Sequence, residues 1–156
     1  MRTKFKLSHS IAGLTALLVI QGLGVYALPQ LATAWLTLAF AAAGAIVTLY
    51  VATEVIEEVR NAQRMLALLS AVSAEFVIFF AFEYLFLTTV STTAFPALPH
   101  DAISLGLHSM MIFVFNPLYL PGNALGRALL LINTASALGL VMFILQNIWQ
   151  FRREVR

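Results

Sequence analysis

The side chains that could support chemistry in this chain are a few polar residues set inside long apolar runs. Glu75 and Glu83 interrupt one such run, and Arg127 and Asn133 interrupt another. An ionised group costs free energy in apolar surroundings, so Glu75, near the middle of its run, is expected to face protein or water, to be paired, or to carry a proton. Glu83 lies toward the end of its run and Arg127 at the start of the next, so both are expected near the same outer surface of the membrane. An ion pair between them is therefore geometrically reasonable.

Asn133 shares one helical face with Ser136 and Ala137. That face could line a pore or hold two helices together, and both interpretations stay open at the level of sequence. The histidines fall at different predicted depths, so they do not form a matched pair of haem ligands, and His108 is expected to pack or to hydrogen-bond. The chain has no cysteine and no nucleotide-binding loop, zinc signature or catalytic triad. We therefore predict neither an enzyme nor a cofactor, and an enzyme that uses Glu75 and His108 is only the third choice of function.

The composition predicts an all-α integral membrane protein. Of the 156 residues, 61% are hydrophobic and 10% are charged, whereas soluble domains carry about a quarter charged residues. The net charge of +2 is too small to favour a nucleic-acid partner. The lipid bilayer is therefore the expected surroundings of the chain, and the polar residues above would have to be positioned by membrane helices.

Four apolar runs are long enough to cross a bilayer as helices, and the first is interpreted as a retained helix rather than a signal peptide. They cover about residues 9–28, 30–53, 65–90 and 124–148. The third is dense in aromatic residues, as lipid-facing outer helices often are. Lysine and arginine precede the first run, separate the second from the third, and follow the fourth. Both termini are therefore predicted to be cytoplasmic in a multi-pass protein of the cell membrane.

We expect a single membrane domain, 1–156. Residues 1–64 would supply two helices and a cytoplasmic connector, with the polar stretch 54–64 continuing the second helix. Residues 65–156 would form a second module.

Between the third and fourth runs lies an apolar stretch that is broken by proline and glycine. Asp101 is suited to cap a short helix that ends at about Phe113, and Pro117 prevents its continuation. About a dozen helical residues span roughly 18–20 Å, which is too short to cross a bilayer. The stretch is therefore predicted to be a re-entrant helix and loop that opens on the outer side.

Local sequence on both sides of this loop resembles the pore module of potassium channels. Asp101-Ala102 before an apolar helix is similar to the start of their pore helix. Leu120-Pro121, followed by Ala124-Leu125-Gly126-Arg127, is similar to the segment that leads into their inner helix. The resemblance covers about residues 65–153. It implies an outer helix, a pore loop and an inner helix, and assembly as a homotetramer, since one loop cannot enclose an axis.

The centre of the loop departs from that family, because the TVGYG filter motif is absent. The corresponding positions carry no glycine and read Phe113, Val114, Phe115, Asn116, Pro117 and Leu118. Glycine permits the backbone angles that aim carbonyls at the axis, and Val114, Phe115 and Asn116 are not expected to adopt them at low cost. Potassium selectivity is therefore not expected.

We predict a channel-like protein that passes an ion or a small solute. Asn116 is the side chain of the loop that could coordinate a permeant species, and the phenylalanines with Leu118 could form an apolar constriction. Packing between helices, and for Asn116 a turn ahead of proline, are the simpler interpretations. The alternative function is a non-conducting polytopic protein or a subunit of a larger membrane complex, with the broken stretch as a plug or docking loop.

Overall fold

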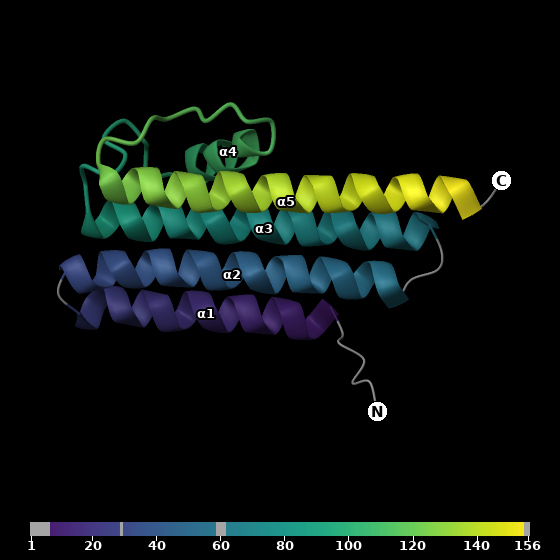
Figure 1. The fold of residues 1–156 in the computed structure, drawn as a ribbon. Coiled ribbons are helices and arrows are strands. Elements are labelled where there is room, and N and C mark those ends of the chain that lie inside the picture. The colour runs from purple at the N-terminus through teal and green to yellow at the C-terminus, as the bar shows by residue number, and fades with distance from the viewer. Residues whose placement is uncertain (1–6, 29, 59–61, 155–156) are drawn as a thin grey trace.

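The structure is a computed structural model that describes residues 7–28, 30–58 and 62–154 (Figure 1). This part of the chain contains helices and no strands, so the all-α prediction is confirmed for it. The helices are α1 (Leu7–Ala27), α2 (Gln30–Glu58), α3 (Ala62–Val90), α4 (Ala102–Ile112) and α5 (Ala124–Glu154).

Three of these helices contain segments that are long and apolar enough to cross a membrane. They are Ala32–Glu57 in α2, Gln63–Val90 in α3 and Ala124–Gln146 in α5. These segments match the second, third and fourth predicted spans. The apolar segment found in α1, Ala12–Gly24, is shorter. The described residues therefore support three crossing helices, and the fourth crossing stays a prediction.

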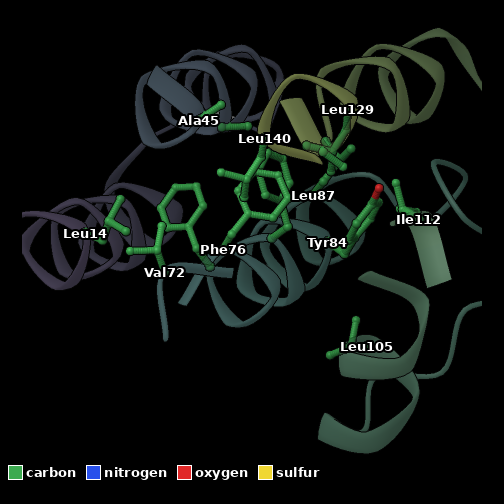
Figure 2. Close-up of a cluster of buried hydrophobic side chains, with 14 of the residues drawn as sticks. Leu14, Ala45, Val72, Phe76, Tyr84, Leu87, Leu105, Ile112, Leu129 and Leu140 are labelled. Atoms are coloured by element: carbon green, nitrogen blue, oxygen red, sulfur yellow. The ribbon is translucent and has the colours of Figure 1, made fainter. Parts of the chain in front are cut away.

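α3 is the central helix, because it packs against α1, α2, α4 and α5. Figure 1 shows the four long helices lying side by side, with α4 on the side formed by α3 and α5. The rings of Phe76, Phe79 and Phe80 on α3 are almost completely buried. The sequence prediction of a lipid-facing aromatic helix is wrong for these rings, because α3 has protein neighbours on several sides. Figure 2 shows Phe76 in one cluster with Leu14 of α1 and Leu140 of α5.

The contact between α2 and α3 is close because α2 presents small residues there. Ala41 is fully buried, and a Cβ atom added to Gly44 would overlap the ring of Phe79. The buried hydroxyl of Thr48 donates a 2.9 Å hydrogen bond to the Gly44 carbonyl, one turn earlier in the same helix. Small residues in this part of α2 therefore allow the two helices to pack closely.

One end of the bundle holds the turn between α1 and α2, the end of α3 and the start of α5 (Figure 1). We call this the loop end. The polar stretch of α2 lies at the opposite end, where α2 continues to Glu58 as predicted. The residues that join α2 to α3, 59–61, lie outside the described part.

Candidate functional site

Residues 91–123, the return segment, leave the loop end, include α4, and come back to the same end before α5 begins (Figure 1). α4 starts where the sequence predicts, because Asp101 is its N-cap. The Asp101 Oδ1 atom accepts a 2.9 Å hydrogen bond from the Ser104 backbone amide. Hydrogen bonds from the side chain and backbone of Ser104 lower the pKa of the Asp101 carboxyl group. The cap is therefore an anion at neutral pH.

α4 ends in a Schellman motif ahead of Pro117. The Phe115 amide donates to the Ile112 carbonyl (2.9 Å), and the Asn116 amide donates to the Met111 carbonyl (3.2 Å). Phe115 occupies the left-handed position of the motif, with a φ angle of 56°. Glycine is usual there, and a bulky residue stores strain. The sequence led us to expect that this backbone region would be avoided, and Phe115 adopts it as part of a helix cap.

Ring contacts with α3 show how far the return segment extends along the bundle. The His108 and Tyr84 ring centroids are 4.7 Å apart, and Tyr84 lies six residues before the end of α3 at Val90. The Phe113 and Phe76 centroids are 5.4 Å apart, and Phe76 lies fourteen residues before Val90. At about 1.5 Å per helical residue, the tip of the segment lies roughly 20 Å from the loop end.

Asn123 anchors the end of the return segment. Its Oδ1 atom caps α5 by accepting a 2.9 Å hydrogen bond from the Gly126 amide. Its Nδ2 atom donates to the hydroxyl of Ser91 (3.1 Å) and to that of Thr93 (3.0 Å). One side chain therefore joins the start of α5 to the residues that follow α3.

Two glycines allow backbone segments to approach closely at the same place. The Gly122 amide donates a 2.8 Å hydrogen bond to the Ala94 carbonyl. A Cβ atom at Gly122 would overlap the Thr93 carbonyl oxygen, and one at Gly126 would overlap that of Ala94. Both positions therefore require glycine for steric reasons, and the two ends of the return segment are fixed to each other.

The residues that correspond to a channel filter, 113–118, form the tip of the return segment. Phe113 is half-buried against Phe76, as the packing interpretation predicted for the phenylalanines. Pro117 is also half-buried. The other four side chains are exposed in the single chain: Val114, Phe115, Asn116 and Leu118. The tip is thus exposed, whereas the two ends of the return segment are fixed.

A second group of polar side chains lies behind the return segment, between α3, α4 and α5. The fully buried Asn133 donates through Nδ2 to the Tyr84 hydroxyl (3.2 Å). His108 is also fully buried, and its Nδ1 atom accepts a 3.4 Å hydrogen bond from the Tyr119 amide. Of the two interpretations of the Asn133 face, the structure favours contact between helices, because Asn133 and Ala137 are both completely buried.

Glu83 faces the other way from Tyr84, toward α1. Its Oε2 atom accepts a 2.8 Å hydrogen bond from Nε2 of Gln21, and both side chains are buried. The expected ion pair with Arg127 is not formed, because Glu83 is directed at α1 and Arg127 is exposed at the start of α5. Glu75, the other intramembrane carboxylate predicted from the sequence, is half-buried on α3.

The two polar contacts lie at similar depth. Gln21, Glu83 and Tyr84 are each six or seven residues from the loop end of their helices, and Asn133 is nine residues into α5. These counts correspond to roughly 9–14 Å of helix. The bundle therefore has a buried polar level beneath the loop end, formed by α1, α3 and α5.

Sequence reasoning did not single out Gln21, Tyr84 or Asn123. Gln21 is the lone amide in an apolar run, and a lone polar residue in a membrane span is itself a signal of a partner. Asn123, three residues before Gly126, has the spacing of a helix N-cap. Tyr84 sits in an aromatic cluster, and nothing in its spacing distinguishes it from its neighbours.

The described residues contain no group of three or more histidine, aspartate or glutamate side chains placed to hold a metal ion. No family model, curated protein or solved structure matches the chain. Its function is therefore inferred from the geometry of the return segment and of the buried polar level.

Proposed function

We propose that this chain is a pore-loop membrane protein that assembles as a homotetramer. It would pass an ion or a small solute and would not be selective for potassium. In this proposal α1, α2, α3 and α5 cross the membrane, and the return segment is re-entrant from the outer side. Residues 113–118 from each copy would converge on a common axis.

The observation that carries the proposal is the uncovered backbone at the tip of the return segment. Within the described structure, the amides of Leu118 and Leu120 make no hydrogen bond. Phe113 places the start of the tip roughly 20 Å from the loop end. Tyr119, which bonds to His108 beside Tyr84, places the backbone that follows the tip roughly 9 Å from it. Non-helical backbone at membrane depth is tolerated where protein buries it or where it lines a water-filled cavity. Copies of the chain arranged around an axis would bury part of this backbone and would enclose a water-filled cavity lined by the rest.

The exposed side chains of the tip define what the pore would present. Asn116 supplies an amide that can hydrogen-bond or coordinate a permeant species. Phe115 and Leu118 supply an apolar constriction, which resists the passage of hydrated ions unless it is wetted. Since the tip has no glycine, the carbonyl ladder of a potassium filter is not expected.

The ends of the helices support the predicted orientation. The start of α1, the end of α2, the start of α3 and the end of α5 all lie at the end opposite the loop end. The lysines and arginines of the chain cluster in these same regions, apart from Arg127. The positive-inside rule therefore favours cytoplasmic termini and a return segment that opens outward.

The experiment combines assembly and flux. The purified chain would be examined by native mass spectrometry, then reconstituted in vesicles and tested for flux of cations, anions and small neutral solutes. We expect a tetramer and a flux that Asn116→Asp shifts toward cations, because four carboxylates would then face the axis. Gln146→Ala, which alters an exposed amide on the opposite half of α5, is the control and should leave flux unchanged.

A chain without cysteine allows a direct test of convergence. In Leu118→Cys, the introduced thiol should cross-link between copies on oxidation, whereas Ile46→Cys, exposed on α2, should not. A monomer or a twofold dimer without cross-linking at Leu118, together with no flux for any tested solute, would refute the proposal.

The alternative function is a non-conducting polytopic protein or a subunit of a larger membrane complex. The exposed apolar tip supports this alternative, because another protein could cover the side chains of Val114, Phe115 and Leu118. Under this alternative, Leu118→Cys would cross-link to a different chain in native membranes and not to its own copy.

A further inference from the structure

The hydrogen bond between Gln21 and Glu83 leaves two oxygen atoms unexplained. The amide donates through Nε2 to Oε2 of the carboxyl group at 2.8 Å. Oε1 of Gln21 and Oε1 of Glu83 are both buried, and neither has a hydrogen-bond partner. A buried acceptor without a donor costs free energy, and a buried carboxylate without a cation costs more.

A single proton would satisfy both oxygen atoms. Placed on Oε1 of Glu83, it allows the carboxyl group to donate to Oε1 of Gln21 while the amide donates back to Oε2. The result is a cyclic acid–amide pair with two hydrogen bonds and no net charge. With both hydrogen bonds formed, neither of the two oxygen atoms is left without a partner.

We propose that Gln21 and Glu83 form a proton-binding site, in which a neutral Glu83 carboxyl group and the Gln21 amide make a reciprocal pair that fastens α1 to α3. The site goes beyond the proposed pore and does not depend on it. Its ligand is the proton, and its consequence is that the attachment of the α1–α2 hairpin responds to protonation.

The charged and titratable groups on the packed helices do not offer a competing partner. The described side chains of α1 include no charged or titratable group. Glu54 and Glu57 lie near the opposite end of α2, and Arg127 of α5 is exposed. On α4, the His108 ring faces Tyr84, Phe95 and Tyr119.

On α3 itself, Glu75 is eight residues from Glu83, roughly 12 Å along the axis. The described structure therefore holds no cation against the Glu83 carboxyl group. A proton is the remaining way to neutralise it.

Two other occupants are less suited to the site. A sodium ion needs more oxygen ligands than the two oxygen atoms that this pair leaves without a partner. A water molecule could donate to both free oxygen atoms, but the carboxylate would then stay charged and buried without a cation. Both occupants are distinguishable from a proton by experiment.

The test is infrared spectroscopy of the purified chain, because a protonated carboxylic acid has a carbonyl stretch distinct from that of a carboxylate. We expect an acid band at neutral pH, where free glutamate, with a pKa of about 4.3, is ionised. The band should disappear in Glu83→Gln and shift in Gln21→Leu, which removes the hydrogen bond. Glu75→Gln is the matched control and should leave the Glu83 band in place.

A second readout uses thermal unfolding as a function of pH. If the folded chain holds a proton that the unfolded chain releases, the melting temperature falls as pH rises above the range where free glutamate ionises. Glu83→Gln should abolish this decline, because two amides form a similar cyclic pair without a proton. The exchanged pair, Gln21→Glu with Glu83→Gln, should restore both the decline and the acid band.

Three results would overturn the proposal. The first is an acid band that is identical in the wild type and in Glu83→Gln. If that variant does not fold, an acid band that stays unshifted in Gln21→Leu would exclude the pair. The second is a carboxylate band for Glu83 at neutral pH, which would indicate bound water. The third is loss of the acid band when sodium replaces choline in the buffer, which would indicate a sodium site.

Discussion

Glu83 and Tyr84 are neighbours on α3, yet they attach two different parts of the chain in different ways. Glu83 holds the α1–α2 hairpin through one contact with Gln21. Tyr84 faces the return segment and α5, where Asn133 and the His108 ring meet it. The hairpin is thus attached by broad apolar packing and one polar pair, whereas the return segment is fixed at several polar points and left open at its tip.

This difference indicates what each attachment can tolerate. Apolar packing between helices has little directional preference, so the hairpin should accept small changes in side-chain size away from its close contact at Gly44. The ends of the return segment depend on close backbone approach and directed hydrogen bonds, so small changes there should cost more. Substitutions in the two regions test this contrast.

Gly126→Ala should be the most damaging substitution. Its Cβ atom would overlap the Ala94 carbonyl oxygen, and we expect a loss of about 3 kcal/mol in the free energy of unfolding. Thermal unfolding in detergent, followed by circular dichroism, measures it. Gly22→Ala in α1 is the matched control, because the added Cβ would meet Phe86 at an ordinary 3.8 Å. Equal losses in both variants would contradict the contrast.

Tyr84→Phe should cost about 2 kcal/mol, because the Asn133 amide would lose its acceptor while staying buried. Combining it with Asn133→Leu completes a double-mutant cycle. We expect the double variant to be less destabilised than the sum of the two single variants, because no polar group is then left without a partner. Simple additivity would show that the two side chains are not coupled.

Phe115→Gly should stabilise the chain, by about 1 kcal/mol, because glycine occupies the left-handed position of a Schellman motif without strain. The gain is expected because the exposed Phe115 side chain gives up little packing within one chain. If the tetramer forms, the same substitution should also widen the apolar constriction and raise flux. A variant less stable than the wild type as a monomer would show that Phe115 packs within its own chain.

Asp101→Ala should have the smallest effect, a modest fall in melting temperature through loss of the α4 cap. The pKa of Asp101 is lowered by its hydrogen bonds with Ser104. Its stabilising contribution is therefore present above the pKa of free aspartate and is lost as pH falls through the lowered value. Asp101→Asn keeps a capping side chain and should not show this acid-dependent loss. An identical acid profile in both chains would exclude Asp101 as the titrating group.

The helices could be predicted from the sequence because apolar runs bounded by polar and breaking residues are local signals. Asp101 as an N-cap and the start of α5 at Ala124 were both predicted in this way. The partners of polar side chains could not be predicted from the sequence, since they depend on which faces of the helices meet. Glu83 pairs with Gln21, 62 positions away, and no local pattern distinguishes that partner from Arg127.

The aromatic residues of α3 show the same limit. A helix rich in phenylalanine suits either lipid or a protein core, because both are apolar. Which one applies depends on how many neighbours the helix has, and α3 packs against all four others. The strain at Phe115 was also beyond sequence reasoning, since it results from a cap motif that glycine normally completes.

The lengths of α2 and α5 have a consequence for how the molecule sits in a bilayer. With 29 and 31 residues, they extend about 44 and 46 Å, whereas the hydrocarbon core is about 30 Å thick. If the loop end is level with one membrane surface, several helical turns project into water at the other. Glu54 and Glu57 lie on those turns of α2, and Arg64 lies near the start of α3 at the same end of the bundle. The bundle would then carry a ring of charged residues that a protease or an antibody added to that side of the membrane could reach.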